Sequence, residues 1–290
     1  MKGPVGIVGC GLLGSAVSRV LLEAGYAVVG TDLAPAALAG LASRGGEVVA
    51  SAAEVARRAR TVFAMLPTLE SVEEAVASVL EGAAAGATIV QMSTISPQLA
   101  VRLEEAARAR GVAFLDAPVS GTSGMVARRE GVITVGGDRG AYDAALPVLE
   151  AVAKKVYFVG ACGQGSMLKL VTNLIMGLNT AVVAEGLNLA RRAGLDPAQA
   201  VEILAQGAGA SRMLEVRGPL MVEGRFEPYM KVELFLKDIR LMIEAAQALH
   251  VPLPLGSAMQ QLFTAAYAGG QEKEDLASVL KVYERMSGGA

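Results

Sequence analysis

The chain has few of the residues that would build a metal centre or a charged docking surface. Its 290 residues include two cysteines and one histidine. A zinc site usually needs several such ligands at close spacing, so we expect no resident metal. Lysine and arginine together number 26, against 28 aspartates and glutamates. This balance provides no basic field to attract nucleic acid or an anionic membrane surface, and we expect neither as a partner.

Aromatic residues and long hydrophobic runs are also scarce. Aromatic side chains make up 4% of the chain although hydrophobic residues make up 53%, so alanine and aliphatic residues must fill the interior. That composition favours helices and argues against an all-β fold. The N-terminal strand is soon interrupted by glycines, unlike the apolar core of a signal peptide, and no window of transmembrane length is free of polar residues. We expect a cytoplasmic protein.

What the sequence does contain is a glycine-rich turn between a strand and a helix. The apolar run Val5–Val8 is followed by Gly9-Cys10-Gly11-Leu12-Leu13-Gly14 and then by a helical pattern. In dinucleotide-binding proteins the first glycine of such a turn permits a tight bend, the second lets the pyrophosphate approach the backbone, and the third allows close packing. Amides at the helix start then face the phosphates. These six residues are predicted to bind a dinucleotide.

An acidic residue follows at the spacing that such proteins use for the ribose. The strand Ala27–Thr31 ends in Asp32, whose carboxylate is expected to accept hydrogen bonds from the ribose hydroxyls and to repel a 2′-phosphate. No arginine or lysine stands at positions 33–36 to hold such a phosphate. The predicted cofactor is therefore NAD in preference to NADP, with NADP left open as the alternative.

Strand and helix patterns alternate up to residue 162, and no strand pattern recurs after Gly194. We predict an α/β fold in which residues 1–162 form a Rossmann-type doubly wound, mostly parallel sheet and residues 163–290 form an all-α C-terminal domain. Ligands bind outside the carboxyl ends of the strands in such sheets. Leu66, Pro67 and Thr94 follow predicted strands, so we expect them along the same edge as the glycine turn.

A long helix is predicted to begin the second domain. The segment from Gly163 to Gly194 has no proline, and its apolar residues recur on nearly every side, which is typical of an interdomain helix surrounded by protein. Lys169 and Asn173 stand four residues apart and therefore project from the same face. A lysine on an apolar helix either reaches solvent or a carboxylate, or it lines a cleft as a proton donor. The residues alone leave both interpretations open.

Six motifs, spread over nearly the whole chain, occur in the order that is characteristic of one protein family. They are GIVGCGLLG at the start, MLP at 65–67, STISP at 93–97, DAPVSG at 116–121, GQGSMLKLVTN at 163–173 and LKDIRL at 236–241. By these motifs the chain resembles the β-hydroxyacid dehydrogenase family, which includes 3-hydroxyisobutyrate dehydrogenases, tartronate semialdehyde reductases and glyoxylate/succinic semialdehyde reductases. The resemblance implies hydride transfer between a nicotinamide cofactor and a small β-hydroxyacid or its semialdehyde.

The resemblance also implies roles for individual residues. Lys169 corresponds to the catalytic lysine, which donates or removes the proton. Ser120, Gly121 and Asn173 are expected to bind the substrate carboxylate, together with Thr122, which stands where the family usually has a third glycine. Leu66, Pro67, Thr94 and Lys237 are expected to contact the cofactor. Asp238 is interpreted as a surface carboxylate with a functional role left open, and Arg128 and Arg129 either face solvent or recognise a second acidic group on the substrate.

Two other functions remain as alternatives at this point. An imine reductase is similar in architecture but typically carries another residue where Lys169 stands. The other alternative is a non-catalytic dinucleotide-binding protein, which some relatives have become by losing this lysine. The apolar helical domain also suggests pairing with a second copy as a homodimer or homotetramer, an expectation that the family shares.

Overall fold

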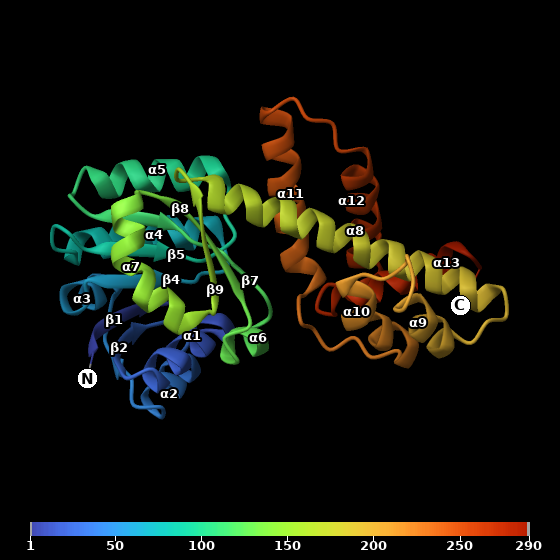
Figure 1. Cartoon of the computed structure of the whole chain (residues 1–290), viewed down its shortest axis with the longest axis horizontal. Helices are drawn as coiled ribbons and strands as arrows, with labels where there is room; N and C mark the ends of the chain where they lie inside the picture. Colours follow the sequence, from blue (N-terminus) through green and yellow to red (C-terminus); the bar gives the residue numbers. More distant parts are fainter. Residues whose placement is uncertain (1, 289–290) are drawn as a thin grey trace. The chain divides into compact units, whose positions relative to one another are not determined.

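The computed structural model describes residues 2–288 (Figure 1). By its internal contacts the chain divides into two compact units between Lys169 and Leu170. The first unit alternates strands and helices, and the second is helical. The predicted fold class, a Rossmann-type α/β sheet followed by a helical C-terminal region, is confirmed.

The first unit contains the whole sheet and the helices that cover it. Its strands are β1 (Lys2–Val8), β2 (Tyr26–Thr31), β3 (Glu47–Val48), β4 (Thr61–Ala64), β5 (Thr88–Gln91), β6 (Ala113–Asp116), β7 (Val119–Ser120), β8 (Val132–Gly137) and β9 (Lys155–Gly160). Its helices are α1 (Leu12–Glu23), α2 (Pro35–Ala42), α3 (Ala52–Arg58), α4 (Leu69–Gly82), α5 (Pro97–Arg108), α6 (Ser123–Ala127) and α7 (Arg139–Val152). The sequence did not predict the short elements β7 and α6, which divide the small-residue segment after β6.

The glycine turn follows β1, the strand at which the order of strand addition reverses. Strands β3-β2-β1-β4-β5-β6 are parallel neighbours in that order, β8 is antiparallel to β6 and β7, and β9 is parallel to β8. The chain passes from one side of β1 to the other between β3 and β4. Val8, Thr31 and Ala64 are register partners, so the segments after β1, β2 and β4 begin level with one another. Open α/β sheets bind ligands at such a reversal.

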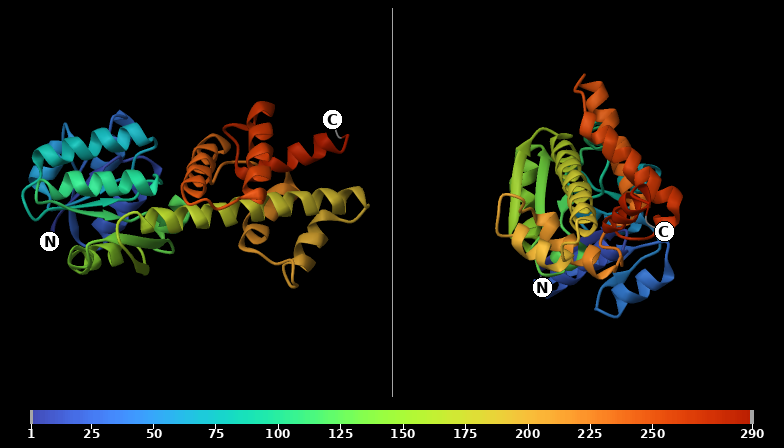
Figure 2. Two further views of the ribbon diagram at one scale, coloured as in Figure 1. Left: turned by 90° about the horizontal axis from the view of Figure 1, so that it is seen from above. Right: turned by 90° about the vertical axis from the view of Figure 1, so that its right-hand side faces the viewer.

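Apolar helix faces cover both sides of this sheet, which explains why its strands read as nearly continuous apolar runs. One buried cluster joins α1 and α7 to the sheet, with Val17 and Leu149 in it. The other joins α3, α4 and α5 to the opposite face, with Val55, Val76 and Leu99 in it. Figure 2 shows the unit from two further directions. The resulting scaffold holds the carboxyl ends of the strands in fixed register.

The second unit is built against the long helix α8 (Gln164–Arg192). Its other elements are α9 (Pro197–Leu204), α10 (Arg212–Glu223), α11 (Val232–Ala248), α12 (Pro254–Ala266), a π-helical turn at Tyr267–Gln271, a 3-10 turn at Leu276–Val279 and α13 (Leu280–Met286). Gly177 lets α8 pack closely, because a Cβ there would lie 2.3 Å from the Phe235 ring and 2.6 Å from the Met259 sulfur. Phe235 and Phe263 meet edge to face with ring centroids 5.0 Å apart.

One prediction about α8 is wrong for the chain by itself. The sequence pattern predicted a helix surrounded by protein, but Ile175, Val182 and Leu189 are 54%, 65% and 70% exposed. The opposite side carries the packing, as at Ala184 and Leu187. Within residues 2–288, α8 is also the one helix with the length and apolar composition of a membrane span. A pattern that is apolar all round therefore included one face that the chain itself does not cover.

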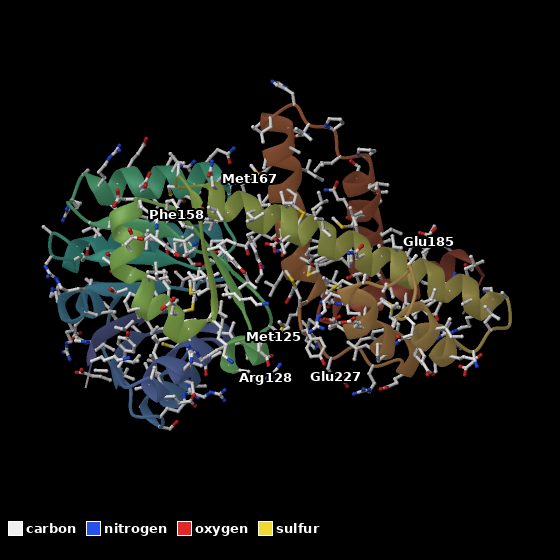
Figure 3. The ribbon with its side chains drawn as sticks, in the orientation of Figure 1. Met125, Arg128, Phe158, Met167, Glu185 and Glu227 are labelled. Carbon is white, nitrogen blue, oxygen red and sulfur yellow. The ribbon has the colours of Figure 1, made fainter. Side chains whose placement is uncertain are left out.

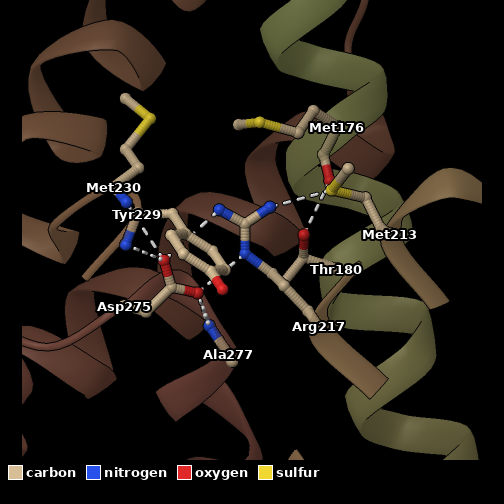
Figure 4. Close-up of polar contacts among 8 residues, drawn as sticks. All are labelled: Met176, Thr180, Met213, Arg217, Tyr229, Met230, Asp275 and Ala277. Carbon is tan, nitrogen blue, oxygen red and sulfur yellow. Dashed lines mark hydrogen bonds and ion pairs between the residues drawn. The ribbon is translucent and has the colours of Figure 1, made fainter. Parts of the chain in front are cut away.

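A buried ion pair joins α10 to the residue before the 3-10 turn of the second unit (Figure 4). Asp275 accepts hydrogen bonds from Arg217 Nε at 2.8 Å and Nη2 at 3.4 Å, and both side chains are buried. The same carboxylate also accepts the backbone N–H groups of Tyr229, Met230 and Ala277, each at 3.0 Å. Because charged groups are expensive to bury without partners, this number of donors accounts for the carboxylate's presence in the interior.

Candidate functional site

Glycine is required in the turn after β1 by the protein's own packing at two positions. Gly9 has φ +90°, and a Cβ there would lie 2.2 Å from the Met65 carbonyl oxygen. A Cβ on Gly14 would lie 1.9 Å from the Gly9 carbonyl oxygen. At Gly11, by contrast, a Cβ would meet no described atom within 4 Å. The space beside Gly11 is therefore open to a ligand that approaches the backbone, as the pyrophosphate of a dinucleotide does.

The start of α1 has the polarity that an anionic ligand needs. Gly11 is the N-cap and has no side chain to accept the first N–H groups of the helix. These groups therefore point toward solvent or a ligand. The first turn, which includes Leu12 and Leu13, carries no acidic residue that would repel a phosphate.

Asp32 ties the end of β2 to the glycine turn. Its Oδ2 accepts the Cys10 backbone N–H at 2.6 Å, and its Oδ1 accepts the Ala34 N–H at 2.7 Å. A carboxylate has further lone pairs, so these two bonds leave acceptor capacity for ribose hydroxyls. The Cys10 thiol donates to the Thr31 carbonyl oxygen, and burial, followed by the charge of Asp32, raises its pKa to about 12. That thiol therefore stays neutral and packs beneath the turn.

An arginine that the sequence did not predict as a cofactor residue lies beside this turn: Arg44 comes after α2, beyond positions 33–36, where a residue that holds a 2′-phosphate is expected. Its Nη2 donates to Ser15 Oγ on α1 at 2.8 Å. Arg44 and Arg19 line an open cavity of about 230 Å³, together with Leu12 and Ser123. A larger cavity of about 460 Å³, lined by Tyr26, Glu47 and Arg58 among others, contains none of the predicted site residues. The surroundings of the turn thus include a cation as well as Asp32.

Hydrogen bonds join the segments that follow β1, β4 and β5. The Met65 N–H donates to the Val8 carbonyl oxygen at 2.9 Å, and the Leu66 N–H donates to Ser93 Oγ at 2.7 Å. The buried Gln91 side chain bonds both the N–H and the carbonyl oxygen of Ser93, each at 3.0 Å. Leu66, Pro67 and Thr94 are thereby held at the same edge of the sheet as the glycine turn.

The segment after β6 connects with the start of α8. Asp116 is fully buried, and its Oδ2 accepts the Gly163 and Ser166 N–H groups at 3.1 and 2.7 Å. Its Oδ1 accepts the Ser166 hydroxyl at 2.6 Å. Burial raises the pKa of Asp116, and the hydrogen bonds from Ser166 and Gly163 act in the opposite direction. In the sequence Asp116 stands out only as part of the DAPVSG motif, because its partners Gly163 and Ser166 lie about 50 residues away along the chain.

The predicted substrate residues lie just beyond Asp116. Ser120 is in β7, and Gly121 has φ +138°. Thr122 is the N-cap of α6, because its Oγ1 accepts the Met125 N–H at 3.2 Å. The structure thus gives Thr122 a local capping contact, and its contact with the substrate stays a prediction.

The two arginines after α6 face solvent. Figure 3 labels Met125, in this short helix, and Arg128, which follows it. Arg128 forms an ion pair with Glu130 at 2.8 Å, with 62% of its side chain exposed. Arg129 donates to the Glu150 carbonyl oxygen. Both side chains therefore have partners of their own outside the predicted substrate residues.

In the second unit, Asp238 connects two predicted site residues. The Asn173 side-chain amide on α8 donates to Asp238 Oδ2 at 2.8 Å, and Lys237 Nζ lies 3.2 Å from Asp238 Oδ1. Asp238 is buried, so its interpretation as a surface carboxylate is wrong. Its neighbours in the sequence gave no sign of this, because its hydrogen-bond partner Asn173 is on another helix. Lys169 precedes Asn173 by one turn on α8 and is half-buried.

No metal cluster accompanies these residues. Across residues 2–288, no three or more His, Cys, Asp and Glu side chains gather as metal ligands would. Both cysteines are buried thiols.

Comparison with known proteins identifies the family. Residues 4–160 match the NAD binding domain of 6-phosphogluconate dehydrogenase, and residues 163–283 match the family described as the NAD-binding domain of NADP-dependent 3-hydroxyisobutyrate dehydrogenase. L-threonate dehydrogenase from Cupriavidus necator is 35% identical over 98% of this chain and 97% of its own length. The chain belongs to the β-hydroxyacid dehydrogenase family. The family resemblance drawn from the six motifs is therefore confirmed.

Two further relatives agree with this membership. 2-Hydroxy-3-oxopropionate reductase from Escherichia coli is 33% identical over 98% of each chain. The crystal structure of a 3-hydroxyisobutyrate dehydrogenase from Salmonella typhimurium matches with a TM-score of 0.90 and 34% identity, over 97% of this chain and 100% of the other. As a β-hydroxyacid dehydrogenase, the chain is an NAD(P)-dependent enzyme of small β-hydroxyacids or semialdehydes, from a family of soluble enzymes. The non-catalytic alternative does not apply.

Proposed function

We propose that this enzyme transfers a hydride between NAD and a small β-hydroxyacid or its semialdehyde, with Lys169 as the general acid and base. The observation that supports the proposal is the arrangement on α8, where Lys169 and Asn173 project one turn apart and Asp238 orients the Asn173 amide. Residues 1–162 form the dinucleotide-binding domain in this proposal. Residues 163–290 form the substrate and dimerisation domain, and the enzyme is cytoplasmic.

The proton chemistry falls to Lys169. The bound nicotinamide supplies the hydride for reduction and accepts it for oxidation. During reduction the Lys169 ammonium donates a hydrogen bond to the substrate carbonyl oxygen, stabilises the negative charge that develops on it, and transfers a proton to give the hydroxyl group. During oxidation the neutral amine takes that proton back. An imine reductase assignment has less support, since this lysine is retained.

Binding of the substrate carboxylate falls to neutral donors. Asn173 keeps one amide hydrogen on Asp238, and the other donates to the carboxylate. Ser120, Gly121 and Thr122 add short hydroxyl and backbone donors. Neutral donors of this kind orient an anion without adding a second positive charge beside Lys169.

The cofactor is held by the turn and the strand ends around it. The residues of the turn, Gly9, Cys10, Gly11, Leu12, Leu13 and Gly14, surround the pyrophosphate in this proposal, and the uncapped N–H groups at the start of α1 face it. Leu66, Pro67, Thr94 and Lys237 complete the contacts. Asp32 favours NAD because a second anion beside its carboxylate is repelled. Arg44, which follows α2 and reaches Ser15 beside the glycine turn, is the feature that favours NADP, so the two cofactors need a direct comparison.

Turnover of three- and four-carbon semialdehydes with each cofactor tests this proposal. We expect NADH oxidation with at least one such substrate and a KM for NADPH about tenfold or more above that for NADH, as repulsion of about 1.4 kcal/mol would give. Absorbance at the nicotinamide band measures both. Asp32→Ala is expected to reduce the ratio of the KM for NADPH to the KM for NADH. Arg44→Ala is expected to leave the KM for NADH unchanged. Equal or better use of NADPH would overturn the NAD assignment, and no turnover of any such substrate would overturn the reaction.

We also propose that two copies pair through the exposed face of α8. Leu168, Ile175, Val182 and Leu189 stand at every seventh position along it and are all exposed, a spacing typical of helices that pack on another helix of the same kind. Sedimentation is expected to give a particle at least twice the 29.7 kDa chain mass. Val182→Lys is expected to shift the equilibrium toward single chains, and Leu195→Lys, at an exposed leucine beyond the helix, is expected to leave it unchanged. Single chains in the unmodified enzyme would refute pairing.

A further inference from the structure

The long helix that carries Lys169 begins without a capping side chain of its own. The residue before its first turn is Gly163, which has no side chain to accept the first N–H groups. Those groups are orphan donors in any helix and need a partner when the helix start is buried. Here the partner is the Asp116 carboxylate at the end of β6, which accepts the Gly163 and Ser166 N–H groups at 3.1 and 2.7 Å.

This cap is supplied from a distant strand and holds the helix tightly. Ser166 also donates its hydroxyl to Asp116 at 2.6 Å, so three hydrogen bonds converge on one carboxylate. Gly165, between the bonded residues, packs so closely that a Cβ would lie 2.2 Å from the Asp116 carbonyl oxygen and 2.9 Å from the Thr134 carbonyl oxygen. The first turn of α8 therefore has little freedom to shift while these contacts persist.

The Asp116 carboxylate is linked both to the helix turn that carries the proposed proton donor and to the segment proposed to bind the substrate. Ser166 is followed three positions later by Lys169, so the two side chains lie on one face of α8, one turn apart. In the other direction along the chain, Asp116 is followed by the buried residues Ala117 and Pro118 and then by β7, where Ser120 lies. A short stretch of rigid structure on each side of Asp116 thus links the proton donor to the substrate-binding segment.

We propose that Asp116 is a positioning residue, whose capping of α8 sets where the Lys169 ammonium stands relative to the substrate held by Ser120 and Gly121. The inference rests on the proposed function, since it assumes that Lys169 transfers the proton. Asp116 itself touches neither substrate nor cofactor in this account. Displacement of a reacting group by about 1 Å is enough to lower a rate by roughly a hundredfold, so a cap at this place has a large effect on turnover.

The test compares two ways of weakening the cap with a cap elsewhere in the same unit. Asp116→Asn keeps the shape but removes the charge, and kcat is expected to fall about tenfold to a hundredfold while KM for NADH changes less than about twofold. Ser166→Ala removes only the hydroxyl contact, and kcat is expected to fall about three- to tenfold. Ser166→Thr, which restores a hydroxyl, is expected to recover most of this loss.

Asp138→Ala is the matched control, because Asp138 caps α7 by accepting the Ala141 N–H at 2.8 Å and α7 carries no proposed site residue. Loss of that cap is expected to lower stability by about 1 kcal/mol and to leave kcat unchanged. If Asp116→Asn and Ser166→Ala keep the unmodified kcat, or lower it only as much as Asp138→Ala does, the positioning role is wrong.

Lys169→Ala, measured alongside, separates the two proposals. If kcat falls in Lys169→Ala but not in the Asp116 and Ser166 variants, the positioning role of Asp116 is refuted and the proposed function is not. Unchanged kcat in Lys169→Ala refutes the proposed function itself. If Asp116→Asn does not fold, the decision rests on Ser166→Ala and its threonine counterpart, which retain both backbone hydrogen bonds to the carboxylate.

Discussion

Alanine in place of Lys169 is expected to lower kcat for semialdehyde reduction by about 10²- to 10⁴-fold, the range typical of a lost general acid. The variant has no group to stabilise the alkoxide or to protonate it, so the loss falls on the chemical step. NADH affinity, measured by fluorescence titration, is expected to stay within about twofold, because the glycine turn and Asp32 are untouched. Turnover is measured by absorbance of NADH under saturating substrate.

Two companion variants make the Lys169 result specific. Lys169→Arg keeps the positive charge but cannot release a proton near neutral pH. We therefore expect its kcat to be nearly as low as that of the alanine variant. Lys155→Ala, at an exposed lysine in β9 of the same unit, is expected to be fully active. Unimpaired turnover in Lys169→Ala would remove lysine from the mechanism, and substantial turnover in Lys169→Arg would reduce its role to charge stabilisation.

Local spacing made the cofactor side of this fold predictable. Gly9, Gly11, Gly14 and Asp32 indicate a strand, a turn and a second strand. Gly9 and Gly14 meet packing requirements of the turn, Gly11 leaves its backbone open to a ligand, and Asp32 follows the second strand at the expected spacing. The alternation of apolar strands with amphipathic helices then gave the parallel sheet. Both signals are carried by residues close together in sequence, which is where a single sequence is most informative.

The contacts that the sequence did not reveal are all between distant residues. Asp116 caps a helix that starts about 50 residues later, and the buried Asp238 accepts a hydrogen bond from an amide on another helix. Arg44 donates a hydrogen bond to Ser15 although it lies outside positions 33–36, where a phosphate-binding residue is expected. No local pattern distinguishes these charged residues from solvent-facing ones, so their partners come only from the folded chain.

The prediction that α8 is buried on every side failed for a different reason. Ile175, Val182 and Leu189 have the composition of buried residues, and periodicity reports only that a face is apolar. It does not say whether the covering surface belongs to the same chain. The residue pattern therefore predicted burial that the chain alone does not provide, and a second copy is the proposed occupant.

Removing the carboxylate of Asp275 is expected to produce the largest loss of stability among changes in the helical unit. In Asp275→Ala the Arg217 guanidinium stays buried without its counter-charge, and three backbone N–H groups lose their acceptor (Figure 4). Breaking one side of a buried ion pair typically costs about 3–5 kcal/mol. Urea unfolding followed by far-ultraviolet circular dichroism, which is sensitive to helices, measures the change.

The partner variants test whether burial, and not the mere presence of an ion pair, is responsible. Arg217→Met leaves Asp275 with its three backbone donors, so we expect a smaller loss than in Asp275→Ala. Arg212, on the same helix, pairs with Glu215 at 2.9 Å, but its side chain is 71% exposed. Arg212→Ala is therefore expected to cost about 0–1 kcal/mol, as surface pairs do. If Asp275→Ala is no more destabilising than Arg212→Ala, the buried carboxylate does not hold the helical unit together.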